Sequence, residues 1–413
     1  MFTLVTLFGF LHFVSPARAA DWLLLQGTEA PDAGAPRPWG FVQALGEGVV
    51  GGGPVEGLTS EGLVAFDGQV PSFNRVGTGD ATFGLSIRRA RVGLRGAIPG
   101  TDGKVGALLA AELGDNGLTR LDPVVLTDAS ITVSLLPGAR VRIGQFKLPL
   151  GEEALEMNPI AAEFINLSTA TSGLLLENPS SGGVTTSGSS GFRDLGLSVF
   201  DGRALGRGAI SYAAMVSNGH MGALDMDNSK DYSARLSWSP RVWQGGSLDP
   251  HRDEWGVYGF WQEGRRDLDG VEARRSRRGL GAQIERGGFR ARAELIDAVG
   301  AIELGASPPF PGQPVAVSAD GRATGGAAFV HGERGLWGAG LRYDTLWRLT
   351  ESPADLRVFQ TVTLDLQAEL SPRARLMLDY ERRWLRAPGG SEDAQTLAAA
   401  MGDRVLLQAV AVF

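Results

Sequence analysis

The sequence predicts an all-β protein, a transmembrane antiparallel β-barrel of about sixteen strands. One observation is a strict alternation of apolar and polar residues, clearest over residues 128–148, where two alternating segments flank Pro137 and Gly138 as in a β-hairpin. The other is composition: 59 glycines accompany only 43% hydrophobic residues, and no apolar run is long enough to span a bilayer as a helix. Because few amphipathic helices are available to cover the apolar faces of the strands, we expect those faces to meet lipid.

Composition also excludes several kinds of function. The chain has no cysteine, which rules out disulfides, thiol chemistry and thiolate metal sites. Its net charge of −7 argues against a nucleic-acid partner, because phosphate backbones bind basic surfaces. We therefore expect neither a cofactor nor a nucleic-acid ligand.

Residues 1–19 are predicted to be a signal peptide. The apolar residues 2–14 are too few for a transmembrane helix, and Ala17, Arg18 and Ala19 form the small-residue pattern of a cleavage site. Cleavage after Ala19 leaves residues 20–413 as the barrel domain, whose first strand begins near Trp39.

The strand predicted over residues 83–97 changes its apolar parity at Arg88 and Arg89. A one-residue β-bulge there restores a single apolar face and directs Arg88, Arg91 and Arg95 to the opposite side. The other strands are expected at residues 39–48, 103–113, 127–136, 139–148, 192–201, 208–218, 230–239, 253–264, 276–286, 289–299, 324–332, 336–347, 357–370, 373–386 and 403–413.

The lengths of the connections support this strand count. A barrel with both ends in the periplasm alternates long outer loops with short inner turns. The odd-numbered connections are the long ones, at residues 49–81, 114–126, 149–191, 219–229, 265–275, 300–323, 348–356 and 387–402. The even-numbered ones are mostly tight, and only the connection at residues 240–252 does not fit this alternation. The third odd-numbered connection carries no alternation over about 40 residues.

Aromatic residues near strand ends are typical of the interfacial girdles of membrane barrels. They are Trp238, Trp255, Trp261, Trp337, Tyr343, Trp347, Tyr380 and Trp384. The last strand ends at Phe413 with apolar residues at alternate positions before it. This ending resembles the C-terminal assembly signal of outer-membrane proteins, so we expect Phe413 to engage the barrel-assembly machinery.

Several short motifs resemble the phosphate-selective porin O and P family. The strand from Ile87 to Gly96 has the R-R-A-R-x-G-x-x-G pattern, and further landmarks follow in the same order over roughly residues 80 to 413. These landmarks are Asp128-Ala129, Arg142-Ile143-Gly144-Gln145-Phe146-Lys147 with Pro149 and Glu153, Phe192-Arg193-Asp194-Leu195-Gly196, Ser217-Asn218-Gly219, Arg235-Leu236 with Pro240, and Leu378-Asp379-Tyr380. The resemblance implies a porin in the outer membrane of a Gram-negative bacterium, usually a homotrimer in lipid, whose third outer loop folds into the lumen and narrows the pore.

The expected function is a water-filled channel for passive diffusion of small solutes, inorganic and other anions among them. Selectivity for phosphate is not carried over, because only Lys104, Lys147 and Lys230 are lysines and the chain is net acidic. The pore-lining candidates are Arg88, Arg91, Arg95, Arg140 and Arg142, and the constriction-loop acids are Glu152, Glu153, Glu156 and Glu163.

Two interpretations of these opposed charges stay open. Across a narrow pore they would orient dipolar or zwitterionic solutes. Alternatively, the loop acids pair with wall arginines and fix the loop. The cluster from Arg88 to Arg95 has no acid of its own, so we expect it to be the least paired part of the wall.

Other functions are less well supported. A plugged barrel serving as adhesin or scaffold is the alternative to a porin. Calcium could bind Asp225, Asp227, Asn228 and Asp231, although a solvated acidic loop explains them too. His220, His251 and His331 are the only histidines after the signal peptide, and none accompanies a nucleophile motif, so we expect neither a catalytic residue nor a resident metal.

Overall fold

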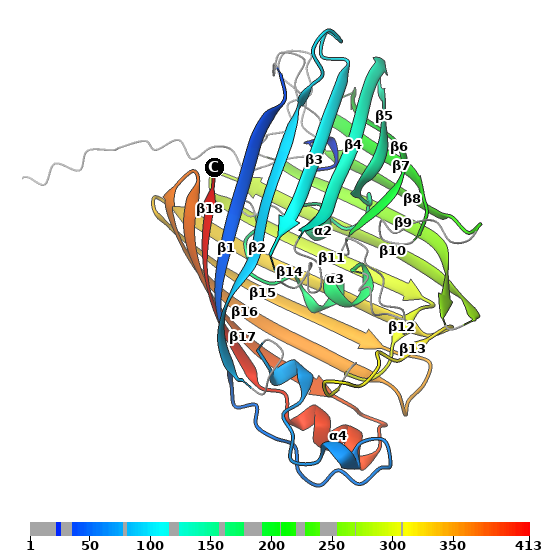
Figure 1. The fold of residues 1–413 in the computed structure, drawn as a ribbon, viewed down its shortest axis with the longest axis vertical. Helices are drawn as coiled ribbons and strands as arrows, with labels where there is room; N and C mark the ends of the chain where they lie inside the picture. Colours follow the sequence, from blue (N-terminus) through cyan, green and yellow to red (C-terminus); the bar gives the residue numbers. More distant parts are fainter. Residues whose placement is uncertain are drawn as a thin grey trace, which may run out of the picture.

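Sixteen antiparallel strands close into a single barrel in the described part of the chain, which confirms the predicted fold class and strand number (Figure 1). The structure is a computed structural model that describes residues 22–25, 35–76, 81–114, 124–156, 162–176, 192–206, 208–219, 228–239, 254–268, 270–306 and 309–413. The predicted signal peptide lies outside these residues.

Each strand pairs with the next one along the barrel, and β1 closes the ring against β18. The barrel strands are β1 (Arg37–Val50), β2 (Phe83–Ala97), β3 (Val105–Leu113), β4 (Val124–Leu136), β5 (Ala139–Lys147), β6 (Arg193–Leu205), β7 (Gly208–Ser217), β8 (Asp231–Ser239), β9 (Glu254–Leu268), β10 (Val271–Arg286), β11 (Phe289–Val299), β14 (Arg322–Arg334), β15 (Trp337–Arg348), β16 (Arg357–Ser371), β17 (Ala374–Arg386) and β18 (Asp403–Val412). Closure leaves no strand edge unpaired in lipid.

The remaining elements precede β1, in the case of α1, or lie in the connections between the barrel strands. They are α1 (Trp22–Leu25), the 3-10 helices η1 (Val64–Phe66) and η2 (Ser72–Asn74), α2 (Glu152–Glu156), α3 (Thr169–Leu174), the strand pair β12 (Ile302–Glu303) and β13 (Val317–Ser318), and α4 (Glu392–Ala399). No helix within the described ranges is long and apolar enough to cross a membrane.

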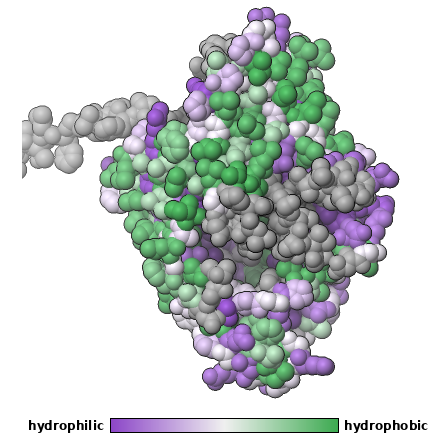
Figure 2. All heavy atoms as spheres, in the orientation of Figure 1, coloured by the Kyte–Doolittle hydropathy of each residue, from purple (hydrophilic) through white to green (hydrophobic). Residues whose placement is uncertain are grey.

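The two faces of the strands differ as the sequence predicts. Along β17, positions alternate strictly between buried and exposed, and the exposed set includes Leu376, Leu378 and Tyr380. All eight girdle aromatics are between 38% and 57% exposed. Hydrophobic side chains accordingly cover much of the outer surface over β1 to β3 (Figure 2). The polar side chains at the alternate positions are buried inside the closed barrel, where they can form a functional site.

The predicted bulge in β2 is confirmed. Gln43 of β1 pairs with Arg89, whereas the next residue, Ala44, pairs with Ile87, so Arg88 is the extra residue. The shift restores one apolar face along β2, with Ile87 and Val92 both exposed.

The predicted outer loop at residues 265–275 is wrong. There β9 and β10 continue as a paired hairpin as far as Leu268 and Val271. Charged pairs hold the extension, with Arg265 contacting Glu272 and Arg274 Nε lying 2.5 Å from a Glu263 carboxylate oxygen. A strand held by charged pairs needs no apolar alternation, so the sequence pattern ended before the strand did.

The connection after β1 packs against α4 at one end of the barrel (Figure 1). The Asp393 carboxylate accepts backbone hydrogen bonds from Thr59 at 3.0 Å and from Ser60 at 2.6 Å. These hydrogen bonds, with those from Ser60 first, lower the pKa of Asp393 to about 2. The rings of Phe66 and Phe310 stack at 5.0 Å between the same connections, so three outer connections form one packed unit.

The C-terminal residue completes the seam of the barrel. Gly40 and Phe413 exchange two backbone hydrogen bonds of 2.9 Å, and the Phe413 side chain remains exposed on the outside. A Cβ atom at residue 40 would meet the Phe413 ring at 2.6 Å, so glycine is required for this approach.

Deleting Phe413 should lower the amount of folded barrel in the membrane, because the deletion removes two seam hydrogen bonds and an exposed apolar ring together. The folded fraction is measured from the mobility of unheated samples on gels. Phe289→Ala, which removes an exposed ring from β11 away from the seam, is the matched control and should assemble normally. Normal assembly of the truncated chain would make the terminal residue incidental.

Candidate functional site

The four acids predicted for the third outer loop lie in the β5–β6 connection, residues 148–192, and contact side chains of distant strands. Glu152 and Glu156 belong to α2, and they and Glu163 are buried. Gly151 precedes α2, and a Cβ atom there would meet the carboxylate of Glu294 on β11 at 2.5 Å. Glycine thus lets the start of α2 approach the wall closely.

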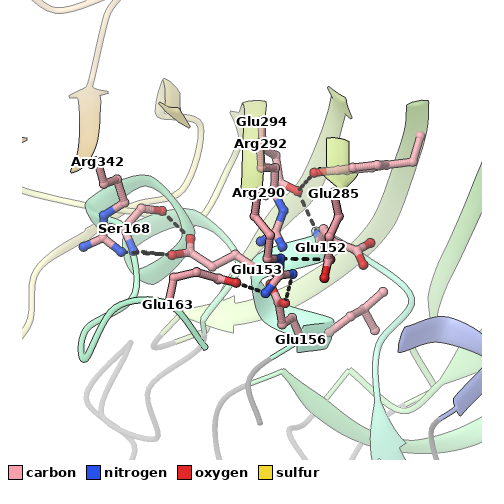
Figure 3. A network of polar contacts seen from close by, with 12 residues as sticks. Glu152, Glu153, Glu156, Glu163, Ser168, Glu285, Arg290, Arg292, Glu294 and Arg342 are labelled. Carbon is pink, nitrogen blue, oxygen red and sulfur yellow. Dashed lines mark hydrogen bonds and ion pairs between the residues drawn. The ribbon is translucent and has the colours of Figure 1, made fainter. Parts of the chain in front are cut away.

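Buried arginines of β8 and β11 pair with three of these acids, and Figure 3 labels the two from β11, Arg290 and Arg292. Arg235 of β8 contacts Glu152. On β11, Arg290 and Arg292 both contact Glu156, and Arg290 also contacts Glu163. These pairs join the loop to the wall through charge-assisted hydrogen bonds in a largely buried setting.

The charge of Glu156 is set by its two arginine partners. Burial alone would raise the pKa of this carboxyl group, but Arg290 and Arg292 outweigh burial and lower the pKa to about 2. Glu156 is therefore ionised at neutral pH, and its charge is matched by adjacent guanidinium groups.

Glu153 organises the second half of the connection. One of its oxygens accepts from the Ser168 backbone at 2.9 Å and from Arg342 at 3.3 Å, and the other accepts the Ser168 hydroxyl. Ser168 in turn caps α3 by accepting from Thr171 at 3.2 Å. Glu153 therefore links the helix cap to β15.

Wall side chains also bind the backbone of the connection. The Ile165 N–H donates to Asp379 at 2.8 Å, and the Thr169 N–H donates to Asp344 at 2.9 Å. Further contacts are donated by wall side chains to backbone carbonyls at 2.6 to 2.8 Å, among them Arg375 to Ala162, Gln367 to Glu163, Arg342 to Asn166 and Arg277 to Leu174. Backbone groups that have no place in a strand or helix are thus satisfied.

Four of the predicted pore-lining arginines, Arg88, Arg91, Arg140 and Arg142, contact groups other than the loop acids in the described part of the chain. Arg88 donates to the Asn166 side chain at 2.8 Å. Arg142 donates to Thr132 at 3.2 Å and lies 4.5 Å from the centroid of the Phe200 ring. Both therefore contact neutral groups of the loop and wall.

The other three predicted arginines have different environments. Arg91 lies 2.8 Å from Glu112 of β3, so the expectation that the β2 cluster is the least paired part of the wall is wrong for this residue. Arg140 lies 3.1 Å from Asp201 and donates to the carbonyl of Leu24 in α1 at 3.4 Å. Arg95 is exposed.

A cavity of about 520 Å³ lies beside this network. Among its lining residues are Gln43, Arg89, Glu156, Phe164, Arg375 and Gln408. Arg89 was not predicted to line the pore, because in a regular strand its side chain would point to the face opposite that of Arg88. The bulge removes this alternation, and Arg89 lines the cavity. Gln43 and Gln408 were missed because a neutral amide on a polar face gives no specific signal.

The sites predicted for other chemistry do not assemble in the described residues. Asp231 pairs with Arg266 at 2.8 Å, while Asp225 and Asp227 lie outside the described ranges. His331 is buried 2.9 Å from Gln367, and His220 and His251 lie outside the described residues. Within the described part, no group of three histidine or acidic side chains could hold a metal ion.

The fold matches solved outer-membrane channels over almost their whole length. The channel DcaP of Acinetobacter baumannii is 13% identical with a TM-score of 0.56, covering 94% of this chain and 99% of that one. Salmonella typhi OmpF in complex with daunomycin is 9% identical with a TM-score of 0.59, covering 93% and 99%. The anion-selective porin from Comamonas acidovorans is 13% identical with a TM-score of 0.55, covering 92% and 99%.

The fold is thus that of an outer-membrane porin. The chain belongs to the phosphate-selective porin O and P family, whose model matches residues 59–278, more than half of its length. A comparison with curated proteins found none that matches. The family and the fold place the protein in the outer membrane of a Gram-negative bacterium as a channel, and they confirm the predicted family and localisation.

Replacing Glu156 with glutamine should destabilise the β5–β6 connection, because Arg290 and Arg292 lose a shared carboxylate in a buried setting. Breaking such a pair costs about 3 kcal/mol. The measurement is the temperature at which the folded barrel unfolds, together with current noise in the open channel. Glu272→Gln, which breaks an exposed pair with Arg265, is the control and should change either value little.

Acidification should release the same contact only at low pH. The folded-state pKa of Glu156 is about 2, below its ordinary value of 4.5. Its contribution to stability is therefore complete above pH 4.5 and is lost as the pH falls through about 2. Unfolding temperatures of the wild type and Glu156→Gln, compared from pH 7 to pH 2, should converge only near the acid end. Convergence already at pH 4.5 would contradict the assignment.

Proposed function

We propose that the barrel conducts small solutes by passive diffusion and prefers anions. The proposal includes an inward-folded β5–β6 connection that narrows the pore. Two features support the inward position: the wall arginines that contact the loop acids are buried, and burial along the strands marks the side opposite the apolar outer face. Contacts of α3 with β11, β14, β15 and β16 are consistent with a segment that crosses toward the far wall.

The preference for anions follows from how the charges are matched. The acids Glu152, Glu156 and Glu163 are neutralised by arginines of β8 and β11. On β2 and β5, Arg88 and Arg142 donate to neutral oxygens instead. This difference is the observation that carries the proposal. Low-dielectric walls focus the remaining positive potential along the pore, which favours anions over cations.

The experiment is the reversal potential of purified protein in a lipid bilayer under a potassium chloride gradient. The reversal potential of the wild type should have the sign expected when chloride is more permeant than potassium. The double variant Arg88→Ala with Arg142→Ala should shift it toward the potassium value while the pore still conducts, because two cationic groups are lost from the wall.

Arg278→Ala is the matched control for this shift. Arg278 is exposed and pairs with Asp297 at 2.8 Å, so it should not affect permeation. An unchanged reversal potential in the double variant would refute the role of these arginines. Absence of any conductance in the folded wild type would instead favour a plugged or structural barrel.

A further inference from the structure

Four neighbouring strands place a row of polar side chains along one wall of the 520 Å³ cavity. Arg375 of β17 and Gln43 of β1 both lie opposite Val410 of β18, and Gln43 also pairs with Arg89 of β2. Gln408 lies two residues from Val410 on the same face. The row therefore consists of two amides flanked by two guanidinium groups, all lining the cavity.

The two amides present acceptors that no described protein group satisfies. Gln43 and Gln408 are 4% and 2% exposed, and the Oε1 atom of each has no hydrogen-bond partner in the described part of the chain. The Gln408 amide nitrogen faces Met377 Sδ at 3.6 Å, a weak acceptor. Buried polar atoms are normally satisfied, so these oxygens favour a cavity occupant that donates hydrogen bonds.

The other residues that line the cavity differ in chemistry. Phe164 and Phe329 pack edge to face at 5.5 Å, which offers an apolar surface. The acids that line the cavity are already engaged: Glu156 contacts Arg290 and Arg292, Glu163 contacts Arg290, and Glu153 lies 3.3 Å from Arg342. An anionic occupant is therefore not faced by an uncompensated carboxylate.

We propose that this cavity is a binding site for small hydroxylated carboxylic acids, an inference that rests on the proposed anion-preferring pore. The carboxylate binds the guanidinium group of Arg89, whose planar geometry suits it, while Arg375 at the far end of the row keeps its donations to the Ala162 carbonyl and to Gln367. Hydroxyl groups donate to Gln43 and Gln408, and the carbon chain packs against Phe164.

The test compares two acids of equal carbon number, butyrate and its trihydroxylated counterpart threonate, with sulfate as an inorganic anion. Each is titrated against the chloride current through single wild-type channels. Threonate should block at a concentration about tenfold lower than butyrate, as expected when hydrogen bonds to the two amides are added. Equal block by the two acids, or stronger block by sulfate, would overturn the proposal.

Gln43→Leu with Gln408→Leu removes both acceptors at similar side-chain size. This double variant should raise the blocking concentration of threonate about tenfold and leave that of butyrate unchanged. Gln360→Leu, on β16 where the amide contacts the exposed Tyr343 at 2.6 Å, is the control. Threonate block unaffected by the double variant would refute the role of the amides.

The two proposals fail in distinguishable ways. A wild-type channel that prefers chloride but blocks equally with both acids keeps the proposed function and removes this site. A channel without chloride preference removes the proposed function, whatever the acids do. If the double variant does not assemble, the proposal is still tested by the ratio of the blocking concentrations of threonate and butyrate in the wild type.

Discussion

The contact between α2 and the arginines of β11 is the interaction on which the arrangement of the site depends. Glu156 bridges two buried guanidinium groups, Arg290 and Arg292, and Arg290 also contacts Glu163 and Glu285. Without Glu156 these buried charges would lose the carboxylate that they share. The same contact fixes the loop and cancels its charge. In the proposed channel the loop acids are matched in this way, and Arg88 and Arg142, which donate to neutral oxygens, set the sign of the potential.

The barrel itself was predictable because the pattern that defines it lies within short segments of the sequence. A strand between lipid and water must alternate apolar and polar residues, and a closed ring with both ends on one side must alternate long and short connections. The parity change at Arg88 and Arg89 was enough to place a bulge, which the shifted register with Gln43 and Ala44 confirms. The apolar alternation stops at the charged hairpin of Arg265 and Glu272, and there the prediction ended β9 and began β10 too far from the turn.

The site was only partly predictable because its contacts are not local. Sequence placed Glu152, Glu156 and Glu163 in one loop, but nothing in their pattern says which arginine of the wall each acid meets. The pairing depends on where the chain turns after Gly151, more than 80 residues before the first partner. The two amides could not be found at all, because Gln43 and Gln408 become distinctive only through burial and an unsatisfied oxygen.

The central claim is that loop acids are internally neutralised while arginines on β2 and β5 face the pore. Anomalous scattering from crystals soaked in bromide, and separately in caesium, tests it most directly because it locates permeant ions of each sign. We expect bromide next to Arg88 and Arg142, and no caesium next to Glu152, Glu156 or Glu163. Caesium at those carboxylates, with bromide missing from the arginines, would contradict the account.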